Sequence, residues 1–574
     1  MSTQPSRSSA VRRYAPFLAI VVVLAVVGIV FALTRTDDLD DASGEEAPTA
    51  LTFDEAVEQD IDTGDWKNCD QDTGRVAIPY PQTPPCVQPP QNDDDEASSD
   101  VQGITDDAIK IAVYLNDPEA NPALFAAFGS LGFDTDTSIT EETVDAYLRL
   151  FEEHYETYGR SLDVEYYIGS GSGDDNEIAR ADAIRIATEI EPFAVIGGPL
   201  QAPEFSAELA DRGIVCIQTC ALAPQREFAI EAAPYVFPVG PVPEQAQTHA
   251  ANFVGKQLAG KNAEFAGDES LHDQERVFGY VAYNTADGYY TPMIEEFTDQ
   301  LSDEYDTEIA VFRDFQLDLA RAQEQAEGFI AAMKDAGVTT VLFSGDPIMP
   351  QFLTQAATAQ DYFPEWVVTA TVYVDTTSFG RGYDQEQWSH AFGISLPAAR
   401  GTQEVQTSYA LFQWQYCAPP VSNVYTVHIQ GPQILLTGIH LAGPDLTPES
   451  FEAGWLKFPP SGGDPSTALV SRGEHDIWPS FDPGGSDDAT VIYWDPTAEG
   501  PDEAGQEGVG MYRYVDGGAR YRPLDWPDDP LPLFDNSQSV TLLEDFGDVP
   551  LLPPYESPCG GEPFEAPSGR GVSG

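Results

Sequence analysis

Short Gly-rich stretches mark the places where phosphate binding or nucleophilic catalysis could be sought in this chain. Residues 169–175 read GSGSGDD and resemble a dinucleotide-binding fingerprint, but Asp174 stands where that motif has its last glycine. A phosphate-binding loop requires G-x₄-G-K followed by Ser or Thr, and no window of the sequence matches it. The G-x-S-x-G turn that exposes a nucleophilic serine is also missing from the sequence. The Gly-rich stretches therefore predict ordinary turns.

Metal-binding and acid–base patterns are equally weak. The seven histidines form no H-E-x-x-H or paired-ligand spacing. Residues 134–138, DTDTS, begin like a calcium loop but lack its glycine, so we interpret them as a helix N-terminus. Carboxylate pairs carry no information here, because 95 acidic residues produce such pairs by chance. The sequence predicts no metal site, no cofactor and no catalytic constellation, and we interpret the chain as not being an enzyme.

Short apolar strands alternate with longer helices, and this happens in two successive series. Such alternation is typical of parallel, doubly wound sheets, so we expect an α/β protein with two lobes of similar build. The expected strands are 108–115, 163–169, 193–198 and 214–219 in the first series, and 276–284, 308–317, 338–346 and 365–373 in the second.

The loops that follow these strands supply the candidate ligand-binding residues. In a parallel α/β sheet, ligands bind at the carboxyl ends of the strands, and a cleft between two lobes is a common place for a small molecule. The break at Gly197 and Gly198 lies at such a strand end, where glycine lets the backbone approach a ligand closely. The predicted cleft residues are Tyr114, Leu115, Gly198, Pro199, Leu200, Gln201, Ala202, Thr219, Cys220, Ala221, Asn284, Asp287, Tyr289, Tyr290, Ser344, Gly345 and Asp346.

The N-terminus predicts a membrane anchor. Arg7, Arg12 and Arg13 precede nineteen uncharged, mostly apolar residues, 15–33, which as a helix would span roughly 28 Å, close to the thickness of a bilayer core. The arginines place residues 1–14 in the cytoplasm and the main domain on the extracytoplasmic side of the cell membrane. A cleaved signal peptide is the alternative.

Composition changes divide the rest of the chain. We expect an acidic, Pro-rich linker whose middle part, around Trp66 to Pro90, docks on the main domain. The expected organisation is a linker with a Cys pair at 34–100, the first part of lobe 1 at 101–242, lobe 2 at 243–366, a lobe 1 return and hinge at 367–471, and a Pro/Gly/Asp-rich tail wrapping the lobes at 472–574.

Net charge and cysteine content limit the possible partners and the compartment. A net charge of −68 disfavours binding to nucleic acid or to an anionic lipid surface. Six cysteines outside a membrane indicate disulfides. Cys69 and Cys86 flank a Pro-rich loop, and Cys417 with Cys559 would tie the tail to the core. Cys216 and Cys220 can bond only if the chain turns between them, because four extended residues span about 13 Å.

The order of these parts resembles the type 1 periplasmic binding proteins, the branched-chain amino acid class of ABC transporter substrate-binding receptors. The resemblance rests on GITDDAIKIAVYL at 103–115, on the strand–helix–strand stretch at 193–225, and on VAYNTADGYYTPMIEEFTDQL and VTTVLFSGDPIMPQFLTQA in the second series. The Cys69–Cys86 preface is similar to that of an actinobacterial, membrane-anchored branch of the class. The resemblance implies two doubly wound parallel-sheet lobes joined by hinge strands, to which the sequence itself adds an expected N-terminal transmembrane helix and an irregular C-terminal tail.

The chain departs from the amino-acid-binding pattern of that class. Leu200, Gln201 and Ala202 stand where the class has hydroxyl side chains for the ligand carboxylate, and Val242 stands nearest to the expected partner of the ammonium group. Losing these partners would cost a zwitterion several kcal/mol. A branched-chain amino acid is therefore disfavoured, and Gln201, Tyr289 and Tyr290 suit a neutral or aromatic molecule better.

The resemblance implies a receptor that captures a small organic molecule and delivers it to an ABC-type permease. The sequence shows one expected span and no ATPase motif, so the chain would not transport alone. Two alternatives remain open. One is a ligand sensor or cell-surface interaction protein built on the same fold, and the other is a secreted hydrolase, which the missing nucleophile motifs disfavour.

Overall fold

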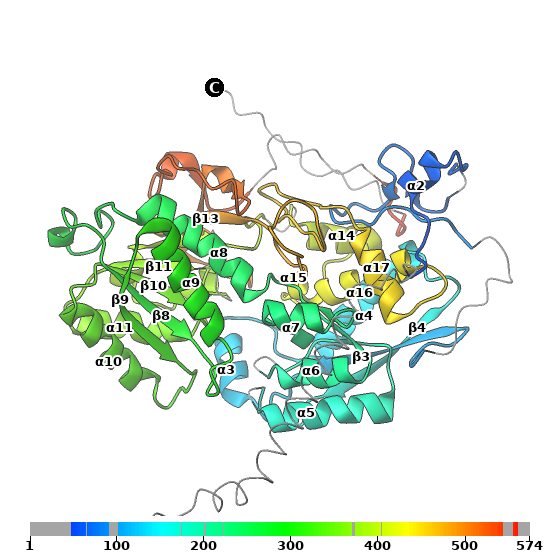
Figure 1. Cartoon of the computed structure of the whole chain (residues 1–574), viewed down its shortest axis with the longest axis horizontal. Coiled ribbons are helices and arrows are strands. Elements are labelled where there is room, and N and C mark those ends of the chain that lie inside the picture. The colour runs from blue at the N-terminus through cyan, green and yellow to red at the C-terminus, as the bar shows by residue number, and fades with distance from the viewer. Residues whose placement is uncertain are drawn as a thin grey trace, which may run out of the picture. The chain divides into compact units, whose positions relative to one another are not determined.

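The computed structural model describes residues 47–64, 66–90, 101–173, 175–199, 202–221, 223–369, 373–402, 405–543 and 555–560. The elements below belong to the unit formed by residues 48–574 (Figure 1). The expected cytoplasmic segment 1–14 and membrane span 15–33 lie outside the described residues. Within the described ranges, no helix has both the length and the apolar character needed to cross a bilayer.

The first sheet is entirely parallel and is covered by helices on both faces. Its strands are β3 (Ala108–Leu115), β4 (Ser161–Ile168), β5 (Ala194–Ile196), β6 (Val215–Ile217) and β7 (Val236–Phe237), in the spatial order β4-β3-β5-β6-β7. Along β3, Ile111 and Val113 face one core while Ala112 and Tyr114 face the other. The second of these cores is closed by α5 (Asn176–Arg185) and α6 (Glu204–Asp211).

Helices from a distant part of the chain complete this first lobe. They are α14 (Thr407–Tyr416), α15 (Tyr425–His428), α16 (Gln430–Ala442) and α17 (Pro448–Leu456). Leu435 and Ile439 of α16 share a core with Ile111 of β3 and with Phe151 of α4 (Thr137–His154). The chain therefore returns to the first lobe after it has formed the parallel strands of the second.

The second sheet repeats the plan of the first. Its parallel strands are β8 (Phe278–Tyr283), β9 (Ile309–Phe315), β10 (Thr340–Ser344), β11 (Glu365–Thr369) and β12 (Ala391–Ser395), in the spatial order β9-β8-β10-β11-β12. Helices α8 (Pro243–Phe253) and α9 (Thr291–Tyr305) pack on one face, and α10 (Ala322–Asp335) and α11 (Met349–Ala359) pack on the other. The prediction of two doubly wound α/β lobes is confirmed.

The C-terminal region differs from the expected irregular tail. Strands β13 (Ala489–Pro501) and β14 (Glu507–Val515) form an antiparallel hairpin that pairs with β12, with β15 (Arg520–Tyr521) and β16 (Ser539–Val540) added to it (Figure 1). The expected end of lobe 2 at 366 is therefore wrong, and the expected wrapping role of 472–574 is wrong for this hairpin. The physical reason is that β13 covers the edge of β12, which would otherwise leave backbone groups unpaired.

Three stretches of chain connect the lobes: 238–242, 396–406 and 457–488. We call them the first, second and third crossover. The first leads from β7 into α8, the second leads from β12 back to α14, and the third leads from α17 to β13.

The remaining elements are short. They are α2 (Phe53–Glu58), β1 (Cys69–Asp70), β2 (Arg75–Val76), α3 (Pro122–Ser130), α7 (Arg226–Glu231), α12 (Thr377–Gly380) and α13 (Gln385–Trp388), with π-helical turns at Ile186–Ile190 and Val254–Leu258 and 3₁₀ turns at Gln218–Ala221, Glu269–Leu271, Asp516–Gly518 and Asn536–Gln538.

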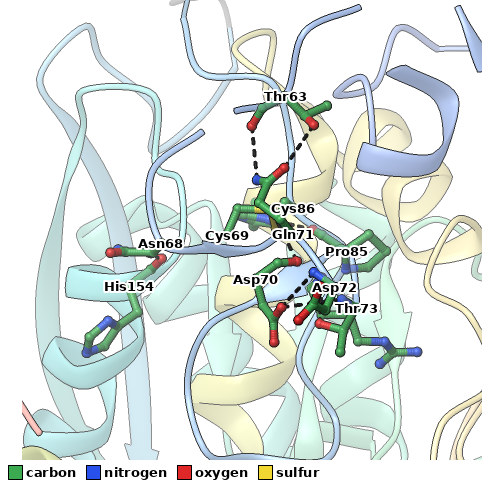
Figure 2. The surroundings of a disulfide bond; sticks show 12 residues. Thr63, Asn68, Cys69, Asp70, Gln71, Asp72, Thr73, Pro85, Cys86 and His154 are labelled. Carbon is green, nitrogen blue, oxygen red and sulfur yellow. Dashed lines mark hydrogen bonds between the residues drawn. A yellow bond between two sulfur atoms is a disulfide. The ribbon is translucent and has the colours of Figure 1, made fainter. Parts of the chain in front are cut away.

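The N-terminal preface docks on the first lobe of the main domain; the sequence predicted docking on the main domain without naming a lobe. Figure 2 shows its disulfide, with Asn68 reaching the His154 carbonyl oxygen of α4 at 3.3 Å. An imidazole nitrogen of His440 lies 2.9 Å from the Pro85 carbonyl oxygen. The Tyr555 hydroxyl donates to Asp70 at 2.6 Å. The preface thus joins both ends of the described chain to the first lobe.

All three predicted cysteine pairs are disulfide-bonded in the structure. The Cα–Cα distances are 5.7 Å for Cys69–Cys86, 5.4 Å for Cys216–Cys220 and 6.0 Å for Cys417–Cys559. The 3₁₀ turn Gln218–Ala221 supplies the chain reversal that the second bond requires.

Candidate ligand-binding site

The loop after β5 is packed tightly by its glycines. Gly197 has a φ of +79°, and its amide donates to the Ile217 carbonyl oxygen at 3.2 Å. A Cβ atom at Gly198 would lie only 2.8 Å from the Cα of Cys220, and the Gly198 carbonyl oxygen accepts a hydrogen bond from Asn116 at 3.1 Å. The close backbone contact between the loops after β5 and β6 therefore explains why position 198 is a glycine. Pro199 and Ala202 are buried, while Leu200 and Gln201 lie outside the described residues.

The loop after β6 is held from two sides. The disulfide fixes Cys220 to Cys216, and Gln218, with a φ of +65°, donates to the Val427 carbonyl oxygen at 2.8 Å. Cys220 and Ala221 are buried, whereas Thr219 is half-buried. Thr219 therefore has the only partly exposed side chain among these three predicted residues.

Tyr114 and Leu115 are engaged inside the first lobe. The Tyr114 ring meets Phe205 edge to face at 5.1 Å, and its hydroxyl donates to Asp182 at 3.4 Å. Burial raises the pKa of this phenol. Leu115 is buried on the opposite face of the sheet. Both side chains are therefore part of the cores of the first lobe.

In the second lobe, Asn284 organises the loop after β8. Its carbonyl oxygen accepts from the amides of Thr285 at 3.0 Å and Tyr290 at 3.1 Å, and its amide group donates to Thr291 at 3.0 Å. These bonds hold Tyr289 and Tyr290, whose half-buried rings stand perpendicular at 5.0 Å. Asp287 is exposed and accepts from the Thr285 hydroxyl at 2.5 Å.

The loop after β10 presents acceptor oxygens. Asp346 Oδ1 accepts from the amides of Ile348 and Met349 at 2.8 and 3.0 Å at the start of α11. Its Oδ2 is buried and has no hydrogen-bond partner in the described part of the chain, and burial raises the pKa of this carboxyl. Ser344 accepts from Gln247 Nε2 at 3.1 Å, while Gln247 Oε1 is buried without a partner within the same described ranges. Gly345 lies between these groups, where a Cβ would come within 2.9 Å of the Phe315 ring.

Direct hydrogen bonds join the two lobes beside these loops. The Gln225 amide contacts the Tyr289 hydroxyl at 3.2 Å, and Gln225 Nε2 donates to the Tyr289 carbonyl oxygen. The Arg226 amide donates to the Glu244 carboxylate at 3.2 Å. The predicted residue Tyr289 therefore contacts the first lobe, which places the loop after β8 next to the segment that follows β6.

Sequence reasoning missed the segment that contains α3. Phe128 of α3 meets the rings of Phe379 and Tyr373 of the second lobe at 5.7 and 6.2 Å, and Phe133 lies 6.4 Å from Phe379. This segment follows β3 and reaches from the first lobe to the second. An uncharged, mostly apolar run from Pro122 to Phe133 was the available signal.

Asp375 was also missed. Ser395, the last residue of β12, donates to Asp375 at 2.6 Å. Burial raises the pKa of Asp375 to about 6. No sequence pattern distinguishes this carboxyl from the many others.

Within the described residues, no group of three or more His, Cys, Asp or Glu side chains is arranged to hold a metal ion. The loops at the strand ends of the two lobes carry the half-buried Tyr289 and Tyr290 and the half-buried Thr219, while the unpaired oxygens of Asp346 and Gln247 are buried. This arrangement can bind a small molecule through ring contacts and hydrogen bonds.

No protein-family model matches the sequence. No curated protein matches it either.

Solved structures of solute-binding proteins do match. The leucine-, isoleucine-, valine-, threonine- and alanine-binding protein from Brucella ovis, in a closed conformation, has a TM-score of 0.50 at 12% identity, covering 74% of this chain and 97% of that one. The fatty acid ABC transporter substrate-binding protein from Thermomonospora curvata has a TM-score of 0.49 at 14% identity, covering 73% and 94%. A solute-binding protein from R. palustris in complex with 4-hydroxybenzoate has a TM-score of 0.47 at 13% identity, covering 74% and 98%. Together with the two parallel sheets, the first of these likenesses shows that this chain has the α/β fold of a type 1 periplasmic binding protein.

Proposed function

We propose that this protein is an extracytoplasmic receptor that captures a small organic molecule between its two lobes. The observation that carries the proposal is the meeting of loops from the carboxyl ends of both sheets. Gln225, which follows β6, bonds to Tyr289, which follows β8. Loops at these strand ends are where α/β sheets bind ligands, and lobe closure about a few connecting segments is a common way to enclose one.

The chemistry of the described walls favours a neutral or aromatic ligand with a hydrogen-bond donor. Tyr289 and Tyr290 offer ring faces, and the unpaired oxygens of Asp346 and Gln247 can accept hydrogen bonds. An unpaired buried acceptor costs about 1–3 kcal/mol, which a ligand donor would recover. After β5 the described residues Gly198, Pro199 and Ala202 carry no hydroxyl, so Thr219, after β6, is the one half-buried threonine or serine among the predicted first-lobe residues that could receive a ligand carboxylate. A zwitterionic branched-chain amino acid is therefore disfavoured.

The proposal includes delivery of the ligand to an ABC-type permease in the cell membrane, with the protein held there by residues 15–33. The acidic character of the chain supports a partner that is neither nucleic acid nor an anionic lipid surface. A ligand sensor on the same fold would share the binding site but would not require a permease.

A thermal-shift screen of the full chain tests this proposal. The compounds are aromatic acids, amides, polyamines and amino acids. A ligand present at 100 times its Kd should add about 2.7 kcal/mol to the stability of the folded state. We expect a shift with aromatic or neutral compounds and none with leucine, isoleucine or valine. A folded sample that shifts with no class of compound would contradict capture of a small molecule, and a shift confined to branched-chain amino acids would contradict the ligand chemistry.

A further inference from the structure

Two buried carboxyl groups meet in the third crossover. Asp482 and Asp487 are each 1% exposed. The hydroxyl of Ser471 lies 3.0 Å from Asp482 Oδ2 and 2.7 Å from Asp487 Oδ2. Trp478 Nε1 donates to the other oxygen of Asp487 at 2.8 Å. The two carboxyl groups are therefore joined through one serine hydroxyl.

A proton on one of the two carboxyl groups allows both contacts of Ser471 to be hydrogen bonds. A serine hydroxyl carries one proton and can donate it to only one oxygen. Its contact with the second carboxyl oxygen is a hydrogen bond only if that carboxyl is protonated and donates to the serine. None of the ion pairs between described residues includes Asp482 or Asp487, so no lysine, arginine or histidine among them neutralises the negative charge of the two carboxylates. Two close carboxylates in a buried site cannot both ionise easily. Burial and the neighbouring Asp482 accordingly raise the pKa of Asp487 to about 8.

The pair lies where the lobes are connected. Gln245 Nε2, in the first turn of α8 in the second lobe, donates to Asp482 Oδ1 at 2.9 Å. A Cβ at Gly485 would come within 2.3 Å of the backbone at Gly240 and Pro241, so the third crossover packs directly against the first. The Arg472 guanidinium stands 4.2 Å above the Phe237 ring of the first lobe. The carboxyl pair thus bonds to the second lobe through Gln245, in the same crossover whose Gly485 and Arg472 pack against the first crossover and the first lobe.

The other charged and titratable groups near the pair bond to residues outside it. Asp488 is bonded to Arg520 at 2.7 Å, and Arg472 is bonded to Glu452 at 2.8 Å. His249 of α8 is buried, and its Nδ1 accepts from Trp526 at 3.2 Å. Burial lowers the pKa of His249 to about 3, so this ring stays neutral over the range in which the pair titrates. His475, in the same crossover, lies 2.9 Å from the Arg472 carbonyl oxygen through Nε2 and is not bonded to either carboxyl group. The proton of the carboxyl pair is thus a local charge that changes near neutral pH.

We propose that Asp482 and Asp487 share one proton and form a pH-sensitive brace between the crossovers, which loosens when the proton is lost in mildly alkaline solution. The folded state then holds a proton that the unfolded chain releases, because an unfolded aspartate has its ordinary pKa of about 3.9. Stability therefore falls as pH rises from about 4 to about 8 and levels off above that. The folded pair keeps its shared proton up to about pH 8. Its hydrogen bonds therefore stay intact in acid and neutral solution and weaken in alkali.

The first experiment compares unfolding of the full chain with that of Asp487→Asn between pH 5 and pH 9. An asparagine amide can donate to Ser471 without a proton from solution, so the variant should lack the pH dependence that the pair contributes. We expect the unfolding equilibrium constant of the unmodified chain to rise, relative to the variant, by up to tenfold for each pH unit between pH 5 and pH 8. Asp335→Asn, at an exposed site on α10, is the matched control and should follow the unmodified chain at every pH. Parallel pH curves for the unmodified chain and Asp487→Asn would overturn the proposal.

A second measurement uses only the unmodified chain and does not depend on the variant folding. The amide of Asp482 donates to the Gly473 carbonyl oxygen at 3.1 Å, and the amide of Asp487 donates to Leu469 at 2.8 Å. Hydrogen exchange, corrected for the intrinsic effect of pH, should show that these two amides lose protection at pH 9 relative to pH 6. The strands β3 and β10 should keep their protection. Equal protection of Asp482 and Asp487 at both pH values would overturn the brace.

Discussion

Replacing Arg520 with alanine is expected to lower the free energy of unfolding by about 3–5 kcal/mol, because it leaves a buried carboxylate without its partner. The Arg520 side chain is 0% exposed and lies 2.7 Å from Asp488, which is 2% exposed. Its guanidinium also donates to the carbonyl oxygens of Leu396 at 2.6 Å and Pro397 at 2.8 Å. Arg520 thus ties the second crossover to the end of the third, and its loss should loosen the connection between the lobes.

Urea unfolding of the full chain measures this effect. The matched control is Arg149→Ala, which removes an arginine that is 69% exposed and lies 3.6 Å from Asp145 on the same helix. Exposed pairs of this kind contribute about 0–1 kcal/mol. A loss below about 1 kcal/mol for Arg520→Ala, equal to that of the control, would mean that the crossovers are not held by this side chain.

Replacing Glu365 with alanine should have an effect of similar size, about 3–5 kcal/mol, within the second lobe. Glu365 is 0% exposed and receives two hydrogen bonds from Arg276, at 2.7 and 2.8 Å. It also accepts from the Phe265 amide at 3.0 Å and the Thr340 hydroxyl at 2.7 Å. These contacts join the amino ends of β8, β10 and β11. The substitution therefore leaves the buried guanidinium of Arg276 without its carboxylate partner.

Glu165→Ala is the control for this second substitution. Glu165 is 52% exposed and lies 3.7 Å from Lys110, so its removal should change stability by less than about 1 kcal/mol. The double variant Arg276→Met, Glu365→Leu should recover most of the loss, because it leaves neither charge unpaired. A double variant as unstable as Glu365→Ala would show that the sheet edge depends on packing there rather than on the ion pair.

The plan of each lobe could be predicted from the sequence because its signals are local. Short apolar runs that end in Gly, Asn or Ser identified the strands, and the amphipathic stretches between them identified the crossover helices. Right-handed βαβ connection then leaves few possible arrangements of a parallel sheet. The turn at Gln218–Ala221 similarly decides whether Cys216 can reach Cys220, and the sequence could state only that condition.

The C-terminal hairpin could not be predicted in the same way. The strands at 489–501 and 507–515 lie in a region rich in Pro, Gly and Asp, and β13 contains Pro496 itself. Its partner, β12, lies about a hundred residues earlier. The exposed edge of β12 exists only after the parallel strands of the second lobe have formed. No local sequence pattern therefore predicts that β13 pairs with it.

The candidate site was predicted as a set of loops but not as a set of side chains. Among the predicted strand-end residues, Tyr289 contacts the first lobe, whereas Tyr114 points into the core, toward Asp182 and Phe205. The side chain of Asn284 forms its hydrogen bonds with residues of its own loop and the start of α9. Which way a loop side chain points depends on contacts with other elements, and those contacts are not visible in a linear sequence.

The most direct test of capture between the lobes is a calorimetric titration of the strongest ligand from the thermal-shift screen against one variant from each lobe. Thr219→Val removes the partly exposed hydroxyl of the first wall, and Tyr289→Ala removes a ring of the second. We expect each substitution to raise Kd at least tenfold, about 1.4 kcal/mol, while both variants stay folded. If both variants bind the ligand as tightly as the unmodified chain, the ligand does not lie between these walls, and the account of the site is wrong.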